Sequence, residues 1–185
     1  MPALDPAPMF PFPIAAARPL ELDQAPVDVG DLAAFTAYLD RLRGEAPSLV
    51  GGYGEPRGIY ALFGGAAADA ADEPRTLHLG LDVWAPAGTP LRAPLDGVVH
   101  SFADNRRFGD YGGTIVLTHT HPDGHAFHTL HGHLARRSLD DLAVGQRIGR
   151  GEVFAWIGAP AENGGWPPHL HLQWIEDMLG QRGDF

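Results

Sequence analysis

Glycine and proline interrupt this chain so often that the sequence favours short strands and tight turns over long helices. The 185 residues include 24 glycines and 17 prolines, and both residue types are unfavourable inside helices and common in turns. Hydrophobic residues make up 44% of the chain, which is enough to form a buried core. The sequence therefore predicts a mainly β fold of short strands joined by tight turns.

Charge and cysteine content exclude several classes of function. The net charge of −10 argues against a nucleic-acid partner and against electrostatic binding to an anionic membrane. Because the chain has no cysteine, disulfides, thiolate metal ligands and cysteine nucleophiles are excluded. A metal ion would have to be held by His, Asp or Glu, and nine of the ten histidines follow residue 80. The chemistry is therefore expected in the second half of the chain.

The N-terminal residues predict an extended arm rather than a targeting segment. Seven prolines lie in residues 1–26, and no basic region precedes the apolar stretch at 9–17. No apolar run is long enough to span a bilayer. We therefore expect a cytoplasmic protein without a membrane-inserted segment, and a secreted or periplasmic location stays open.

Residues 28–43 predict a helix within this N-terminal part. Apolar side chains recur there at helical spacing, Asp28 or Asp31 can cap the first turn, and Gly44 can end the helix. The helix is expected to pack on the main domain through its apolar face. The apolar residues are Leu32, Phe35, Leu39 and Leu42.

From residue 76 onward the pattern is typical of β structure. We therefore divide the chain into an N-terminal extension at 1–75 and a β domain at 76–185. The His-Pro-Asp-Gly sequence at 121–124 predicts the turn of a hairpin. The strands are expected at 114–119, 126–133, 153–157 and 170–175, with one helical turn at 138–142.

Two segments of the β domain share a loose form. Residues 88–99 and 145–153 each contain a glycine turn, a short strand, a second glycine turn and another strand. Similarity between segments of one chain is the mark of internal repetition. The match is short, and it suggests a duplicated half-motif.

The segment from Pro168 to Leu172 places two histidines two residues apart. On a strand, successive side chains point to opposite faces, so His169 and His171 would share one face. Leu170 and Leu172 would then share the other face, which gives a strand with a core behind it and a site in front. An ordinary polar strand face is the alternative interpretation.

Two further pairs have even spacing. His78 and Asp82 lie four apart, and the helix-breaking Gly80 favours a strand on which both share a face. His131 and His133 lie two apart, so their imidazoles are expected to share a face as well. Zinc in a hydrolase takes three protein ligands and leaves a position for water. The set of His78, Asp82 and one later histidine would suffice, although alone the first pair is more common as a surface pair.

The order of these three motifs resembles that of the lysostaphin/LytM-type zinc metallopeptidases. The resemblance extends over residues 77–176 and includes the Gly-Thr-Pro and Asp-Gly turns after the first motif and a glycine-rich hairpin after the central one. It implies duplicated-hybrid-motif or barrel-sandwich-like antiparallel sheets, with a short N-terminal helical extension. The corresponding segments are 78–83, 85–90, 93–99, 129–134 and 144–158.

Carried onto this sequence, the resemblance implies a zinc metalloendopeptidase that cleaves peptidoglycan cross-links or other small-residue peptides. One of two catalytic histidines would accept the proton of the attacking water, and the pair would stabilise the tetrahedral intermediate. His131 stands where the family usually carries Tyr. The implied Zn2+ ligands are His78, Asp82 and His171, and the implied catalytic histidines are His133 and His169.

Two other segments resemble an intracellular subgroup of the same family. Residues 51–57 and 163–168 are similar to members whose peptidase-like domain is fused to kinase-like and aminotransferase domains. This similarity implies fusion or partner domains, and a substrate other than the cell wall.

Two other functions stay open. A zinc-binding regulatory module that no longer cleaves would keep the metal ligands, and the N-terminal arm could lie across its cleft. A histidine phosphocarrier would share the duplicated β architecture and use two facing histidines, but Asp82 fits that function less well.

The remaining histidines and aromatic residues give weaker indications. Four histidines around the hairpin turn favour a solvated loop over a second metal site. Three tryptophans could line a groove, although burial is the more common role of this residue type, and Tyr111 could flank the cleft. The histidines are His119, His121, His125 and His128, and the tryptophans are Trp84, Trp166 and Trp174.

Overall fold

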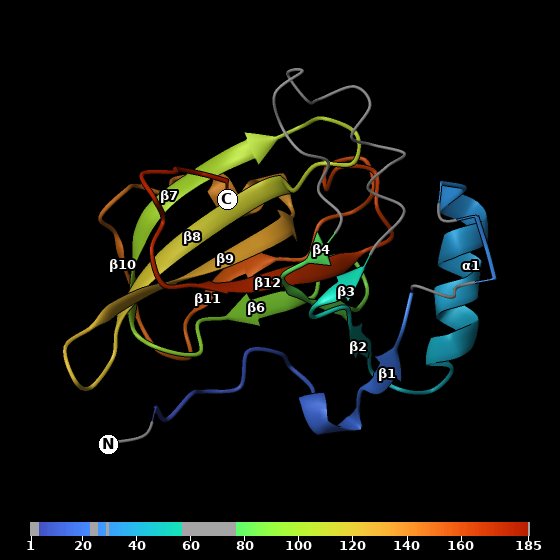
Figure 1. Ribbon diagram of the computed structural model, residues 1–185, viewed down its shortest axis with the longest axis horizontal. Helices are drawn as coiled ribbons and strands as arrows, with labels where there is room; N and C mark the ends of the chain where they lie inside the picture. Colours follow the sequence, from blue (N-terminus) through green and yellow to red (C-terminus); the bar gives the residue numbers. More distant parts are fainter. Residues whose placement is uncertain (1–3, 23–25, 29, 57–76, 185) are drawn as a thin grey trace.

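One large sheet forms the centre of the fold (Figure 1). The computed structural model describes residues 4–22, 26–28, 30–56 and 77–184, and within them this sheet has eight strands. In spatial order they are β1 (Arg18–Leu20), β2 (Leu49–Gly51), β5 (Leu81–Trp84), β12 (His169–Ile175), β9 (Ala126–Leu134), β8 (Gly112–Thr120), β7 (Gly97–Asn105) and β10 (Arg147–Ile148). β1 and β2 pair in parallel, and every other neighbouring pair is antiparallel. The prediction of a mainly β, antiparallel fold is confirmed.

A two-stranded sheet covers one face of the large sheet. It pairs β6 (Pro90–Arg92) with β11 (Val153–Trp156) and lies along the large sheet in Figure 1. Because side chains alternate along strands, the inward-facing apolar residues of both sheets meet in one buried cluster. A second small sheet pairs β3 (Glu55–Pro56) with β4 (Leu77–His78). The cluster includes Leu91, Ile115, Leu117, Leu134, Phe154 and Leu170.

The two similar segments of the β domain exchange strands. Along the chain β6 leads to β7 and β10 leads to β11, but β6 pairs with β11 and β10 pairs with β7. Hydrogen bonds at the turns repeat the exchange. Gly88 N donates to Ile157 O, and Gly145 N donates to Val99 O, both at 2.8 Å. The two halves therefore form one unit, because neither completes its strand pairing alone.

Two local predictions are confirmed with small shifts in their bounds. β8 and β9 form the predicted hairpin, and His121 N donates to His125 O across its turn at 2.8 Å. The predicted helix is α1 (Leu32–Arg43), which begins after Asp31, and the Asp31 carboxylate accepts hydrogen bonds from two backbone amides of the first turn. It ends at Gly44, whose φ of 53° is accessible to glycine without strain.

Two 3-10 helices complete the described helical elements. η2 (Arg136–Leu139) overlaps the helical turn that the sequence predicts at 138–142, but it begins two residues earlier and ends three residues earlier. η1 (Ile14–Ala16) interrupts the arm that is predicted to be extended. Among the described residues, no helix is both long and apolar enough to cross a membrane.

The N-terminal extension packs against the β domain in two places. Phe10 lies in the main core, and Arg92 N donates to Met9 O at 2.8 Å. β1 and β2 continue the large sheet beyond β5, and α1 packs beside them (Figure 1). The described part of the extension thus shares sheet and core with the β domain, and the predicted boundary at residue 75 lies outside the described residues. The cluster under α1 includes Leu20, Phe35, Leu39, Leu49 and Trp84.

Candidate metal centre

His78, Asp82 and His171 converge in the interior beside the large sheet. His78 Nε2 lies 3.2 Å from Asp82 Oδ1 and 2.9 Å from His171 Nδ1, and the latter lies 3.3 Å from Asp82 Oδ1. All three side chains are buried. Protein ligands about 2.0–2.1 Å from a tetrahedral zinc ion lie roughly 3.3 Å from one another. Two imidazoles and one carboxylate at these separations therefore fit an ion of that size, and sequence spacing alone could not test this.

The first two of these residues reach the site from different strands. His78 ends β4, which pairs with β3, whereas Asp82 lies on β5, which pairs with β2 and β12. The expectation that both share one face of a single strand is therefore wrong, because the strand breaks between them. The break is at Gly80, where an added Cβ would lie 2.3 Å from the ring of His171. Only glycine leaves room for that imidazole.

Hydrogen bonds on the outer side of the rings set which nitrogen faces the site. His78 Nδ1 lies 2.7 Å from Gly52 O, and His171 Nε2 lies 3.3 Å from Gln173 Oε1. Since an oxygen accepts the proton in each case, the lone pairs of His78 Nε2 and His171 Nδ1 point to the centre. Sequence reasoning missed both partners. Gln173 could have been predicted, because it is the next residue after His171 on the same face of β12. Nothing in the sequence around Gly52 indicates that its carbonyl bonds to His78.

His133 and His169 form the other half of the site. Their ring centroids are 4.2 Å apart, and His169 Nε2 lies 3.9 Å from Asp82 Oδ1. His133 Nδ1 donates to Asn163 O and His169 Nδ1 donates to Pro167 O, both at 2.8 Å. The outer nitrogens are thus occupied, and in each ring Nε2 is the nitrogen directed away from these carbonyls. The structure therefore brings together all five residues that the resemblance implies, and the role of each stays a prediction.

A backbone irregularity, and not strand alternation, turns His133 into the site. Its φ is 60°, and the register of β8 and β9 shifts between Gly113 and Ile115. A left-handed residue reverses the alternation that the rest of the strand follows. The expectation that His131 and His133 share a face is therefore wrong.

His131 instead lies in the core behind the sheet. It is fully buried with its ring edge-on to Phe154, and Nδ1 donates to Ile115 O at 3.3 Å. Among the described residues, its Nε2 has no hydrogen-bond partner. Burial lowers the pKa of His131 to about 3. This histidine is therefore a neutral core residue that does not face the site.

Burial also affects the histidine that faces the site. Burial, together with the neighbouring imidazoles of His169 and His171, holds the pKa of His133 well below its usual value. His133 is therefore neutral at pH 7, with its lone pair on Nε2. A neutral imidazole of this kind can accept a proton.

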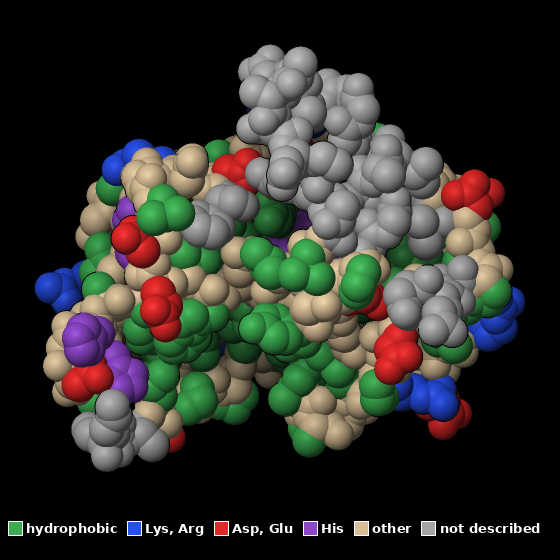
Figure 2. Space-filling view, viewed as in Figure 1, with side chains coloured by type: hydrophobic (Ala, Val, Ile, Leu, Met, Phe, Trp, Pro, Cys, Tyr) green, Lys and Arg blue, Asp and Glu red, His purple; other side chains and the backbone are tan. Residues whose placement is uncertain are grey.

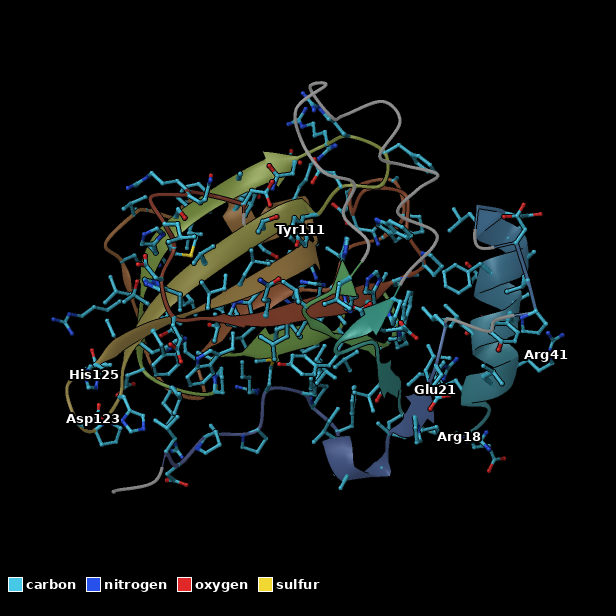
Figure 3. The ribbon with its side chains drawn as sticks, viewed as in Figure 1. Arg18, Glu21, Arg41, Tyr111, Asp123 and His125 are labelled. Atoms are coloured by element: carbon cyan, nitrogen blue, oxygen red, sulfur yellow. The ribbon has the colours of Figure 1, made fainter. Side chains whose placement is uncertain are left out.

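Aromatic residues surround the histidines. The ring of Tyr111, labelled in Figure 3, lies 5.1 Å from His171 and 5.9 Å from His133, so this residue flanks the site. An added Cβ on Gly132 would lie 2.8 Å from the Tyr111 ring, which explains a glycine between the two histidines of β9. Trp166 lies 6.2 Å from His133.

The other two tryptophans have different positions. Trp84 is buried and stacks on His169 with 4.0 Å between ring centroids. Trp174 is 52% exposed and stacks on Phe127 at 3.9 Å. Core burial thus describes Trp84, whereas Trp166 and Trp174 are more open.

Exposed apolar side chains lie close in sequence to the site. Tyr53 follows Gly52 and is 78% exposed, and Leu79 follows His78 and is 54% exposed. Figure 2 shows histidine surface deep in a hollow near the middle of this face, with hydrophobic side chains along its lower rim.

The hairpin histidines lie away from this centre. Asp123 and His125 are at the tip of the β8–β9 hairpin in Figure 3, where Asp123 pairs with His121 and His125 at 2.9 and 3.1 Å. His119 is not in a solvated loop as expected, because it is buried and bonded to Asp96 O and Thr129 Oγ1. Across the described ranges, His78, Asp82 and His171 make up the one compact group of three possible metal ligands.

Comparison with known proteins places the chain in a family. The family model described as Peptidase family M23 matches residues 76–181, which is more than half of the chain. The chain belongs to peptidase family M23. The matched segment of this M23 chain contains all five converging residues.

Curated relatives cover the same segment of this M23 chain. It is 37% identical over 97 residues to "DD-carboxypeptidase/endopeptidase Mpg" of Neisseria meningitidis, which is 52% of this chain and 20% of that protein. It is 32% identical over 98 residues to "Peptidoglycan DD-endopeptidase ShyC" of Vibrio cholerae, which is 53% of this chain and 20% of that protein. The chain thus spans about a fifth of the length of these relatives.

Solved structures include the catalytic domain of lysostaphin from Staphylococcus simulans. The match has a TM-score of 0.48 at 21% identity and covers 77% of this chain and 86% of that domain.

Proposed function

We propose that this M23 chain is a zinc metallopeptidase that hydrolyses peptide bonds between small residues, such as those of peptidoglycan cross-links. The observation that carries the proposal is the convergence of His78, Asp82 and His171 beside two further histidines. Membership of a peptidase family supports the chemistry, and the buried N/N/O donor set supports zinc over metals that prefer oxygen ligands.

The metal would be held by His78 Nε2, Asp82 and His171 Nδ1. Three protein ligands leave a position open, as catalytic zinc sites require. When bound, zinc supplies Lewis acidity, which activates water and polarises the scissile carbonyl. The outer partners of the two imidazoles would hold the rings in place before the metal binds.

The remaining two histidines would move the proton. The neutral ring of His133 has its lone pair on Nε2, where it can accept the proton of the attacking water. His169 has the same orientation, and the Asp82 carboxylate 3.9 Å away would stabilise its protonated form. One of the two rings would take the proton from water and pass it to the leaving amine, which completes hydrolysis of the peptide bond.

The substrate class is proposed from the relatives and the entrance. Two relatives that match the M23 segment carry endopeptidase names, and one of these names specifies peptidoglycan. Tyr53 and Leu79, which follow Gly52 and His78 in the sequence, would offer exposed apolar contacts to a substrate. Peptides of Gly and D-Ala are therefore the first substrates to test. Fusion or partner domains and a cytoplasmic location stay predictions.

The regulatory alternative gains no support from the described part of the arm. Residues 4–22 run along β6 and β2 and do not cross the cleft, because Ala7 N donates to Pro94 O and Phe10 lies in the core under β6. A module whose cleft is covered by this part of the arm is therefore not the favoured function.

The decisive experiment combines metal content with turnover. We expect one zinc per chain by elemental analysis, lost in His171→Ala and in Asp82→Ala and retained in the control His125→Ala, whose side chain is 86% exposed at the hairpin tip. His169→Ala should retain zinc but lower peptide hydrolysis by about 100-fold. Wild-type protein that binds no zinc, or a zinc-loaded protein inert on every small-residue peptide, would contradict the proposal.

A further inference from the structure

A cavity of about 180 Å³ lies against the loop whose Asn163 carbonyl bonds to His133. One wall is formed by Gly164 and Gly165, which directly follow Asn163, and the Asn163 carbonyl accepts the hydrogen bond of His133 Nδ1. The β7–β8 connection closes the other side, where Gly109 N donates to Gly164 O at 2.8 Å. The cavity is therefore one residue away from the support of a proposed catalytic histidine. Its lining includes Arg106, Phe108, Arg136, Glu162, Gly164 and Gly165.

Two arginines in this lining are held by one carboxylate. Arg106 Nε lies 2.6 Å and Arg136 Nε lies 3.2 Å from the same oxygen, Asp104 Oδ2. Both contacts use Nε, so each guanidinium is fixed at its inner nitrogen. Within the described ranges, the terminal Nη atoms of both side chains make no hydrogen bond. A guanidinium held in this way offers its outer N–H groups to a ligand at a reduced entropic cost.

Glu162 is the one acidic residue among the described residues that line the cavity, and its carboxylate accepts hydrogen bonds from backbone amides. Glu162 Oε2 accepts from Arg136 N at 3.0 Å, and Oε1 accepts from Ala159 N at 3.2 Å. Asp104 is engaged by the Nε atoms as described. Hydrogen-bond donors therefore stay available in this cavity, while the Glu162 carboxylate and Asp104 Oδ2 are already engaged and Asp104 Oδ1 makes no hydrogen bond with the described residues. This arrangement contrasts with the whole chain, whose net charge is −10.

We propose that the Arg106/Arg136 pocket binds a carboxylate of the peptide substrate, close to the scissile bond. Paired guanidinium groups bind carboxylates through charge-assisted, two-pronged hydrogen bonds. The volume suits a carboxylate-bearing group and not a whole ligand, since sites for drug-sized molecules exceed about 300 Å³. This inference rests on the proposed peptidase function and deepens it: the preferred substrate is an acidic peptide with a free carboxylate beside the cleavage site.

A preference for acidic peptides must come from the pocket, because the net negative charge of the chain does not attract them. A chain of charge −10 repels an acidic peptide at long range, so attraction can come only from short-range contacts. Replacing the substrate carboxylate by a carboxamide keeps the shape and removes the charge. That comparison isolates the pocket from every other feature of the substrate.

The test uses the zinc-loaded full chain and two forms of one peptide. The probes are N-acetylated Lys-D-Ala-D-Ala and N-acetylated tetraglycine, each as the free acid and as the C-terminal amide. We expect kcat/KM to be about tenfold higher for the acid of at least one pair, an effect of one good charged hydrogen-bond pair. In the double variant Arg106→Gln/Arg136→Gln the acid and the amide should be cleaved at equal rates, so that the ratio of the two kcat/KM values falls to one.

A matched control is provided by Arg147→Gln. Arg147 is exposed on β10, which pairs with the start of β7, whereas Arg106 follows the end of β7. This variant has half the charge change of the double variant and should keep the acid preference. A wild-type protein that shows no preference for either acid, or a double variant that keeps the preference, would overturn the inference.

Binding separates this inference from the proposed function. The four peptides are titrated calorimetrically into the full chain after chelation of its metal, with the fold checked by circular dichroism. Tighter binding of the acid that disappears in the double variant supports the pocket even if no peptide is cleaved, in which case the proposed function alone fails. Cleavage of acid and amide at equal rates, with equal binding, rejects the pocket and leaves the proposed function intact.

Discussion

The indole of Trp84 stacks on the imidazole of His169, with ring centroids 4.0 Å apart and planes inclined by 21°. Trp84 also contacts Phe35 of α1 edge-on, with ring centroids 5.6 Å apart. The N-terminal helix is thus connected through one aromatic ring to a proposed catalytic histidine. The N-terminal extension therefore packs against the tryptophan that contacts His169.

Loss of this stacking should impair turnover without removing the metal. We expect Trp84→Leu to keep one zinc per chain, to lower kcat about tenfold and to lose roughly 2–4 kcal/mol of unfolding free energy, because a large buried ring is replaced. Trp84→Phe keeps an aromatic face and should restore most of kcat. Zinc analysis, steady-state kinetics and urea unfolding provide the three measurements. An unchanged kcat in Trp84→Leu would show that the stacking has no part in positioning His169.

Gln173 should control metal affinity through the ring of His171. Its Oε1 lies 3.3 Å from Nε2 of that ring, and loss of such an outer partner costs about 10–100-fold in affinity in other metal sites. We expect Gln173→Leu to weaken zinc binding by that amount in a chelator competition, and Gln173→Glu to retain it. Gln181→Leu, at an exposed position, is the control. Equal affinity of Gln173→Leu and wild type would remove Gln173 from the metal site.

Gly80 should be required for zinc binding although it carries no ligand atom. An alanine there would place Cβ 2.3 Å from the His171 ring, so the imidazole would have to move. We expect Gly80→Ala to lower the zinc content measured by elemental analysis. Gly149→Ala should have no effect, because the nearest atom to its Cβ would be the end of the Glu152 side chain at 3.4 Å. Full zinc content in Gly80→Ala would contradict the packing argument.

His131 should make the protein sensitive to acid. Its pKa is about 3 in the folded state and 6.5 ordinarily, so below pH 6.5 the unfolded chain binds a proton that the folded chain excludes. The stability from this group is complete above pH 6.5 and is lost as the pH falls toward 3. The loss between pH 7 and pH 5 should be about 2 kcal/mol.

The measurement is urea unfolding at both pH values. His131→Phe removes the titrating group and should reduce the acid loss by about that amount, whereas His125→Phe at the exposed tip should not change it. If wild type and His131→Phe lose equal free energy between pH 7 and pH 5, the buried histidine is not the source.

The sequence by itself determined the features that depend on the backbone geometry of a few neighbouring residues. Alternation along β12 places His169 and His171 on one face, since both rings approach Asp82 while Leu170 is buried in the core. The Asp31 cap and the β8–β9 turn follow in the same way from side-chain hydrogen bonding and from residues that tolerate turn angles. The five candidate site residues were named through the family resemblance that the order of the histidine motifs carries, because spacing alone left the third metal ligand open.

Only the tertiary structure decided which side chains face the centre and what supports them. His133 reaches the site through a single left-handed residue, and its neighbour His131 is thereby left in the core. Gly52 supports His78 from 26 residues away, through strand pairing that no local pattern records. The physical reason is that periodicity is set by the bonds within a strand. Which side chains meet at the site is set by which distant strands pair, and by where the register of that pairing shifts.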